Sequence, residues 1–172
     1  MSSPKQTNPN LVLGLDPGLN ITGYGLIDVS KSQPELVEAG ILRSKKSDDL
    51  PIRLATLYKG LVDVLQSAQP GVVAIEELYS HYDRPTTSIL TGHARGVLCL
   101  ATAQYDLPLY HYAATQVKKT LTGNGRAPKQ QVQMAVARQL HLNDIPEPPD
   151  VADALAIAMC HHFLSRKPAS LL

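Results

Sequence analysis

Two uninterrupted apolar segments, at residues 11–15 and 71–75, place the strongest constraint on how this chain can fold. Both are short, and a turn or acidic residues follow each directly, so they are typical of strands rather than helices. The first reads as a buried strand. The second has no polar alternation, which is typical of a central strand buried on both faces. The chain is therefore expected to fold around a sheet that contains both segments.

The order of the other apolar patterns completes the expected fold. Strands at residues 23–29 and 36–43 follow the first after short polar turns, which indicates an antiparallel meander. A helix is expected at residues 51–69, with Asp48 or Asp49 as its cap. A polar loop at 81–87 is expected to lead into a second helix that extends through residue 104. A fifth strand is expected at 107–112, and further helices at 113–121, 128–142 and 150–164. The order βββ-α-β-α-β-α-α-α predicts a single α/β domain over residues 11–166, with a mixed five-stranded sheet flanked by helices. Residues 1–10 are polar and are interpreted as a flexible N-terminal tail.

Composition excludes several other classes of protein. Hydrophobic residues make up 44% of the chain and charged residues 18%, which indicates a globular rather than a disordered protein. No apolar run approaches the ~20 residues of a membrane-spanning helix, and the first ten residues lack the apolar core of a secretory signal. Cys99 and Cys160 lie in apolar helical patterns and are expected to be buried thiols. A cytoplasmic location is therefore expected.

Charge is distributed unevenly along the chain. The net charge is only +1, yet residues 84–143 carry seven basic residues and one acidic residue. That segment therefore has a net charge of +6 and the remainder one of −5. This pattern suits a protein that holds a polyanion in one place and collects cations in another. An uneven but merely solvated surface explains the same numbers, so charge alone does not decide.

Four carboxylates stand at the ends of expected elements. Asp16 follows the first buried strand, Glu76 ends the second, and Asp150 and Asp153 share one face in the first turn of the last helix. Taken singly, each has a structural explanation as a turn residue, a solvated strand end or a helix cap.

Taken together, the same four residues favour a metal site. Carboxylates brought close together repel one another, and divalent cations relieve that repulsion. Oxygen ligands without His or Cys favour Mg²⁺ or Mn²⁺ over zinc. Two such ions ~3.5–4 Å apart are the usual arrangement for phosphodiester hydrolysis. The element order allows two strand ends and a helix start to meet at one sheet edge.

Five sequence blocks resemble the RuvC family of Holliday-junction resolvases. In chain order they are residues 13–18 (LGLDPG) with 22–25 (TGYG), 74–76 (AIE), 92–97 (GHARGV), 112–118 (YAATQVK) and 150–156 (DVADALA). The blocks extend from residue 11 to about residue 160 in the family's order and spacing. Each alone is weak evidence, whereas all five together are highly specific.

The resemblance implies a fold, an activity and partners. A ribonuclease-H-like fold is expected, with a homodimer that resolves four-way DNA junctions by paired symmetric nicks in homologous recombination and DNA repair. The implied cofactor is Mg²⁺, for which Mn²⁺ would substitute, with two ions in each active site. A branch-migration helicase complex of the RuvA and RuvB type is the implied partner.

The resemblance also assigns roles to individual residues. Asp16, Glu76, Asp150 and Asp153 match the family's catalytic, metal-binding acids. Glu77 adjoins Glu76, but the motif selects Glu76. The positions that match DNA contacts are Lys118, Lys129, the aromatic Tyr79 that would stack on junction bases, and Arg84 in the loop after Tyr79.

Some features depart from the family pattern or fall outside it. The ten-residue N-terminal extension is longer than usual, as is the loop after Tyr79. Some family members place a His in the metal shell, but His161 and His162 lie two turns or more beyond Asp153 and are expected at a solvated helix end. The dimer interface is expected on the apolar face of the helix that contains Leu90, Val97 and Leu98.

Three alternative functions follow from the same motifs. An actin-like phosphotransferase also has an Asp-x-Gly turn after its first strand, but that fold needs two such domains and 172 residues provide one. A junction-binding protein without catalysis has no electrostatic reason to keep four acids beside a polyanion. A single-domain nuclease that processes RNA ends fits the basic segment equally well, and only the full set of blocks favours DNA junctions.

Overall fold

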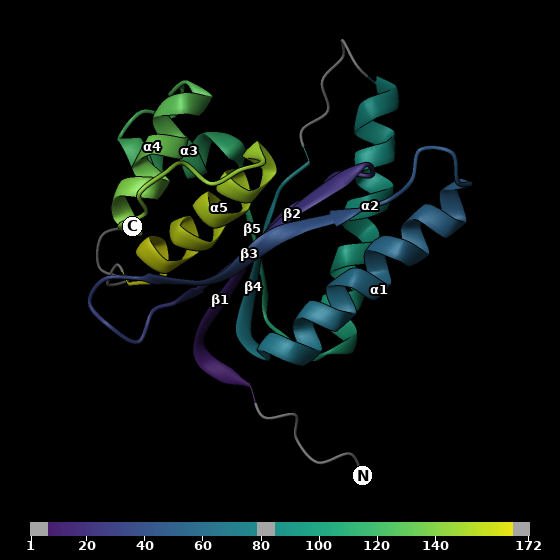
Figure 1. The fold of residues 1–172 in the computed structure, drawn as a ribbon, viewed down its shortest axis with the longest axis horizontal. Coiled ribbons are helices and arrows are strands. Elements are labelled where there is room, and N and C mark those ends of the chain that lie inside the picture. The colour runs from purple at the N-terminus through teal and green to yellow at the C-terminus, as the bar shows by residue number, and fades with distance from the viewer. Residues whose placement is uncertain (1–6, 79–84, 167–172) are drawn as a thin grey trace.

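The computed structural model describes residues 7–78 and 85–166 and contains one five-stranded sheet with helices on both faces (Figure 1). The strands are β1 (Asn8–Asp16), β2 (Ile21–Asp28), β3 (Glu35–Arg43), β4 (Pro70–Glu76) and β5 (Leu109–Tyr112). The helices are α1 (Leu50–Ala68), α2 (Pro85–Gln104), α3 (Ala114–Thr122), α4 (Lys129–Gln139) and α5 (Pro149–Ser165). The element order is the expected one.

The sheet is mixed, as the sequence predicts. Its strand order is β3-β2-β1-β4-β5. β1, β2 and β3 pair antiparallel as a meander, whereas β1, β4 and β5 pair parallel. The two strands that end in Asp16 and Glu76 are therefore neighbours that run in the same direction. Their carboxyl ends lie at the same edge of the sheet.

Helices cover the two faces of the sheet in separate layers. Figure 1 shows α1 and α2 on one face and α5, together with α3 and α4, on the other. Side chains alternate along a strand, so β1 contributes Leu13 and Leu15 to the core under α1 and α2, and Val12 to the core under α5. β4 does the same with Ile75 and Ala74. This alternation determines which face each strand-end carboxylate occupies.

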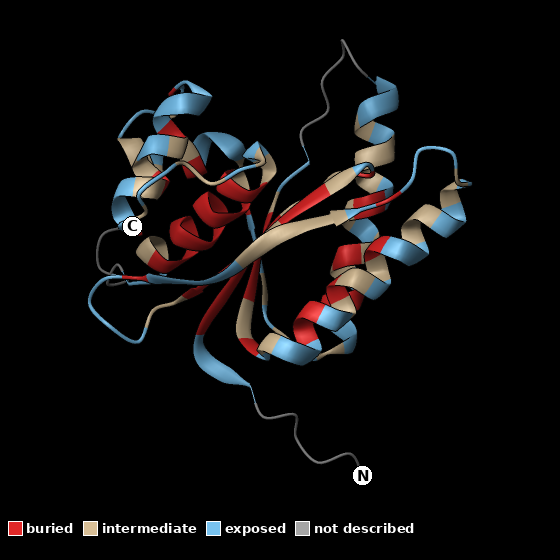
Figure 2. Cartoon of the chain, viewed as in Figure 1, coloured by how far each residue is buried: buried red, intermediate tan, exposed pale blue. Residues whose placement is uncertain are grey.

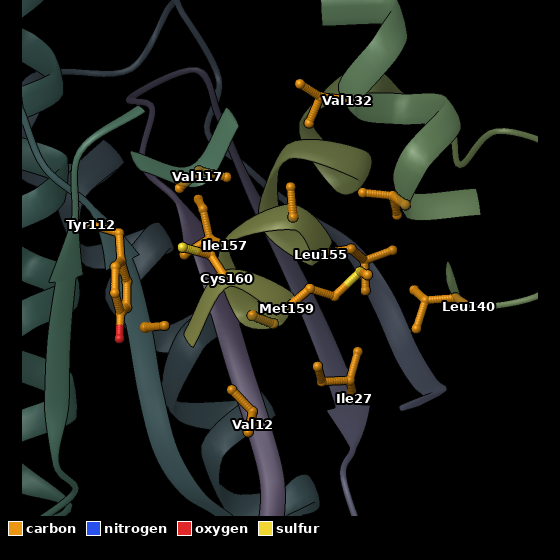
Figure 3. Packing of buried hydrophobic residues seen from close by; sticks show 14 of the residues in the cluster. Val12, Ile27, Tyr112, Val117, Val132, Leu140, Leu155, Ile157, Met159 and Cys160 are labelled. Atoms are coloured by element: carbon orange, nitrogen blue, oxygen red, sulfur yellow. The ribbon is translucent and has the colours of Figure 1, made fainter. Parts of the chain in front are cut away.

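Helix α5 is the centre of the larger core. It is buried over most of its length (Figure 2), because it lies between the sheet and the α3–α4 pair. Figure 3 shows its Leu155, Ile157 and Met159 among side chains from the strands and from α3 and α4. A helix that is apolar around its whole circumference is stable only when buried in this way.

Four local expectations are corrected by the structure. β1 begins at Asn8, three residues earlier than expected, because backbone hydrogen bonds such as Asn8 N to Gln69 O extend the strand beyond its apolar residues. α2 begins at Pro85, within the segment expected to be a loop. Asp49 is the N-cap residue of α1, but its side chain makes no capping hydrogen bond. Leu98 of α2 is fully buried in the core between α2, α1 and the sheet, so it cannot belong to a surface for a second copy.

The histidines of α5 are also placed differently from the expectation. His161 and His162 are only 7% and 3% exposed to solvent, so neither lies at a solvated helix end. The Tyr112 hydroxyl and Nδ1 of His161 are hydrogen-bonded at 2.8 Å. The thiol of Cys160 is buried as expected, and that of Cys99 is partly buried. Among the described residues, no helix is both long and apolar enough to cross a membrane.

Candidate active site

Asp16 and Glu76 lie on the same face and at the same edge of the sheet. Asp16 follows Leu15, which faces α1 and α2, so alternation directs Asp16 to the α5 face. Glu76 follows Ile75 in the same way at the end of β4. Because β1 and β4 are paired and parallel, both carboxylates meet in front of α5.

Glycines bring the start of α5 against this edge of the sheet. A Cβ atom at Gly14 of β1 would overlap the backbone of α5 at Ala154 and Ala158. One at Gly23 of β2 would overlap the backbone of Asp150. Gly23 is the partner of Asp16 across the β1–β2 pair, so the first turn of α5 lies beside Asp16. The close approach that only glycine permits therefore places Asp150 and Asp153 with the two strand-end carboxylates.

The pKa values of the two strand-end carboxylates are raised by their surroundings. Burial raises the pKa of Asp16 well above its ordinary value, and the charges of Glu76, Asp153 and Asp150 raise it further. Burial also raises the pKa of Glu76, and the charge of Asp153 adds to that effect, while two nearby lysines oppose it. The carboxylates of Asp16 and Glu76 are thus less stable in their charged forms than they would be alone in water. A bound cation would lower these pKa values again, because it would stabilise the charged carboxylates.

Lys118 and Lys129 are the two lysines beside the carboxylates. Nζ of Lys129, at the start of α4, lies 2.6 Å from Oδ2 of Asp153. Partial burial lowers the pKa of Lys129, but the hydrogen bond to Asp153 and the surrounding negative charge outweigh it, so the pKa is raised. Lys118, on α3, is close enough to Glu76 to lower the pKa of that carboxyl.

Three adjoining hollows, which we call the active-site groove, curve past these groups. The first, of about 220 Å³, is lined by Glu76, Lys118, Lys129 and Asp153. The second, of about 560 Å³, shares Glu76 and Lys118 and extends to α2. The third, of about 390 Å³, shares Thr91 of α2 with the second and reaches Asp150. The groove is therefore acidic at its centre and basic beside it.

The donor chemistry of the carboxylate group fits a hard divalent cation. All of its ligand atoms would be carboxylate oxygens, which Mg²⁺ and Mn²⁺ prefer. Within residues 7–78 and 85–166, no three or more His, Cys, Asp or Glu side chains are placed so that they could hold a metal ion together as they stand. The raised pKa values of Asp16 and Glu76 nevertheless show that these buried carboxylates would be stabilised by positive charge.

The sequence located most of the residues of this site. The structure brings together Asp16, Glu76, Asp150, Asp153, Lys118 and Lys129. Tyr79 and Arg84 lie outside the described residues. Glu77 is exposed and lines the groove beside Glu76. Sequence reasoning missed a role for Arg95, which contacts the backbone of Glu76. Its only signal in the sequence was its place in the GHARGV block.

Comparison with known proteins gives consistent matches over nearly the whole chain. Residues 12–161 match the family described as "Crossover junction endodeoxyribonuclease RuvC". The chain is 53% identical to the protein of that name from Rhodopirellula baltica over 157 residues, which cover 91% of this chain and 88% of the relative. It is also similar to the Thermus thermophilus RuvC structure, with a TM-score of 0.84 and 31% identity over 91% of this chain and 95% of that one.

A second Thermus structure carries a substrate. It is described as T. thermophilus RuvC in complex with Holliday junction substrate, and it matches with a TM-score of 0.85 and 30% identity, covering 91% of this chain and 94% of that one. These likenesses confirm the ribonuclease-H-like fold that the sequence blocks imply.

Proposed function

The chain belongs to the RuvC family of crossover junction endodeoxyribonucleases, and we infer from this that it resolves four-way (Holliday) DNA junctions in recombination and repair. It is a structure-selective endonuclease that makes paired symmetric nicks. The observation that carries the proposal is the convergence of four carboxylates at one sheet edge, beside two lysines and in an open groove.

Nucleases of this family depend on divalent metal ions. In this chain we assign the ligands to Asp16, Glu76, Asp150 and Asp153, and the cofactor to Mg²⁺, with Mn²⁺ able to substitute and two ions in each active site. Bound there, the ions supply the Lewis acidity that activates water and stabilises charge on the scissile phosphate. The mutual repulsion of the carboxylates supports this assignment, because it makes the site favourable for cations.

The residues around the carboxylates hold the DNA backbone. Lys118 lines two of the hollows of the groove, and Lys129 stands at the start of α4 beside Asp153. Each offers a positive charge to a phosphate that approaches the acidic centre. Tyr79 and Arg84 belong to the same proposal as a stacking residue and a further DNA contact, and both rest on the sequence alone.

A second copy of the chain completes the functional unit. A four-way junction has two equivalent strands to cut, and one active site cannot reach both, whereas a two-fold dimer presents two sites related by the junction's own axis. Helix α2 offers a surface for this dimer. Ile89 and Leu100 on its outer side are 61% and 54% exposed, and a Cβ atom at Gly96 between them would meet open space. These positions lie on one side of the helix, away from its buried Leu98.

The branch-migration partner is proposed from the family alone. A helicase complex of the RuvA and RuvB type would deliver junctions to the groove.

Cleavage of a synthetic four-way junction tests the proposed function. The protein is incubated with the junction and with a linear duplex of matched sequence, each with and without Mg²⁺. Symmetric nicks in the junction alone, and only with Mg²⁺, are expected. The variant Asp16→Asn serves as the control for a contaminating nuclease. Junction binding without cleavage under all metal conditions would instead identify a catalytically inactive binding protein, and cleavage of RNA ends alone would identify an RNA-processing nuclease.

A further inference from the structure

The guanidinium of Arg95 makes two hydrogen bonds behind the carboxylate group. Nε donates to the main-chain oxygen of Glu76 at 2.9 Å, and Nη2 lies 2.6 Å from Nδ1 of His111 on β5. Because a guanidinium only donates, Nδ1 of His111 is the acceptor. One planar group therefore ties helix α2 to the end of β4 and to the neighbouring strand.

We propose that Arg95 is a positioning residue that holds Glu76 in the geometry needed to bind metal. The proposal rests on the assigned function, since it concerns the same site. Arg95 contacts the backbone of Glu76 and acts through it. The side chain of Arg95 is not itself one of the proposed metal ligands.

The end of β4 needs such a support. Pairing of β4 with β1 ends at Leu15 and Ile75, one residue before Glu76. On the other side, pairing with β5 continues only as far as Glu76, and the amide of Glu77 donates to Tyr112 O just beyond it. Glu76 is thus held by the sheet on one side only.

Electrostatic repulsion acts on Glu76, which the sheet holds on one side only. The carboxylate of Glu76 is partly buried beside Asp153 and Asp16, and its pKa is raised by that burial and by the charge of Asp153. Repulsion of this kind favours movement of the strand end away from the other acids. The hydrogen bond from Arg95 to the Glu76 carbonyl opposes that movement without adding a ligand.

The shape of the guanidinium explains why arginine is suited to this position. Its donors are fixed in a plane, so Nε and Nη2 can serve two acceptors on different strands at once. Lysine is a single flexible ammonium group and would hold one acceptor well but not both in a fixed orientation. The proposal therefore predicts that Arg95→Lys is an incomplete replacement.

Arg95 lies on α2, the helix that also carries the proposed dimer surface. Arg95 and Thr91 line the active-site groove, whereas Ala94 and Leu98 pack into the cores on the sheet side. Leu100 lies on the outer, exposed side. The helix that we assign to the dimer thus also holds a catalytic strand end in place.

Metal binding measured apart from cleavage tests the proposal. Mn²⁺ binding to the free protein is followed by electron paramagnetic resonance for the wild type, Arg95→Gln and Arg95→Lys. The expected loss of Mn²⁺ affinity for Arg95→Gln is about 10-fold or more, as for other residues that orient metal ligands, with a smaller loss for Arg95→Lys. The Mg²⁺ concentration for half-maximal junction cleavage should rise in parallel, while junction affinity in EDTA changes little.

Two further variants separate positioning from folding. Arg166→Lys, at the opposite end of α5, is the matched control and should leave both metal readouts unchanged. His111→Ala, which removes the other acceptor, should weaken Mn²⁺ binding in the same direction as Arg95→Gln. Thermal unfolding of each variant shows whether it is folded at the assay temperature.

Defined results would overturn the proposal. Wild-type Mn²⁺ affinity in folded Arg95→Gln contradicts it, and so does a loss of junction affinity with unchanged metal dependence, which would make Arg95 a phosphate contact. If the wild type binds Mn²⁺ but cleaves no junction, the proposed function fails while the binding comparison still tests the role of Arg95.

Discussion

The backbone of Asp150 rests on Gly23, in the space that a side chain at Gly23 would occupy. Gly23 pairs with Asp16 across β1 and β2. The contact therefore fixes how closely the first turn of α5 approaches the strand-end carboxylate. The distance between the acids of the sheet and those of the helix depends on a residue that carries no functional group.

The variant Gly23→Ala is expected to abolish cleavage although it removes no carboxylate. The added Cβ would meet backbone atoms of Asp150, which cannot rotate away, so α5 must shift. Overpacking of this kind costs about 1–3 kcal/mol, and the melting temperature should fall by several degrees. Junction cleavage and thermal unfolding measure the two effects.

Gly60→Ala in α1 is the control for this substitution. The atom nearest to the added Cβ would be Cδ2 of Leu42, at 3.0 Å, and this end of a flexible side chain can move. Stability should change by less than about 1 kcal/mol, because helix propensity favours alanine over glycine, and cleavage should persist. Normal cleavage by Gly23→Ala would show that the position of α5 is not critical.

Conservative replacement of any one catalytic acid should abolish cleavage and preserve junction binding. The variants are Asp16→Asn, Glu76→Gln, Asp150→Asn and Asp153→Asn. Junction affinity should stay the same or increase, because a negative charge that faces phosphate is removed. Asp16→Asn should also raise the melting temperature in metal-free buffer, since Asp16 is destabilised by burial and by its acidic neighbours. Near-normal turnover in Mg²⁺ by the Asp16 or Glu76 variant would refute the assignment.

Lys118→Ala and Lys129→Ala should both weaken junction binding, but to different degrees. Each phosphate contact contributes about one unit to the slope of log affinity against log salt, and Lys118→Ala should remove about that much. Lys129 already forms an ion pair with Asp153, so its loss should reduce the slope less. Binding titrations at several salt concentrations measure both. Equal affinity and slope in the wild type and both variants would mean that the DNA lies elsewhere.

Much of this site could be predicted from the sequence, and particular residues show where prediction failed. Asp16 and Glu76 were identifiable because a buried apolar strand directly precedes each. The approach of α5 depends on Gly14 and Gly23, whose role appears only when helix and sheet are packed together. Arg95 lies in the GHARGV block, but that block does not reveal its bond, which is made to a backbone carbonyl from another element.

The histidines of α5 show a different limit. A polar pair near the end of a helix is usually solvated, but His161 is held by the Tyr112 hydroxyl from β5 and is covered by the same layers as the rest of α5. Tertiary packing therefore decided its environment. Local sequence could not indicate this, because Tyr112 lies 49 residues away.

The variant Leu100→Glu is expected to disrupt the proposed dimer. A charge on the outer side of α2 would be desolvated in an interface built around Ile89 and Leu100. Sedimentation should show a shift to monomer, with loss of paired nicking. Val37→Glu replaces a similarly exposed apolar residue on β3 and should remain dimeric. A wild-type protein that sediments only as a monomer at micromolar concentration, with junction cleavage intact, would exclude the dimer.

Burial of His161 predicts a pH-dependent contribution to stability. Burial lowers the pKa of His161, and the charge of neighbouring His162 lowers it further. The folded state therefore binds this proton less readily than the unfolded state, whose histidine has a pKa near 6.5. Stability is lost as the pH falls from about 7 toward the lowered pKa, by at most about 1.4 kcal/mol per pH unit for one proton. Raised pKa values at Asp16 and Glu76 act in the opposite direction, because those groups bind protons more readily when folded.

A difference measurement isolates the contribution of His161 from that of the carboxylates. His161→Gln cannot titrate, and it keeps a polar group that can bond to the Tyr112 hydroxyl. Denaturant unfolding of the wild type and the variant is compared between pH 7.5 and pH 5. The carboxylates are common to both proteins, so their effect cancels in the difference. The stability of His161→Gln relative to the wild type should increase as the pH falls through this range. A difference that stays constant with pH would show that His161 is protonated equally in the folded and unfolded states.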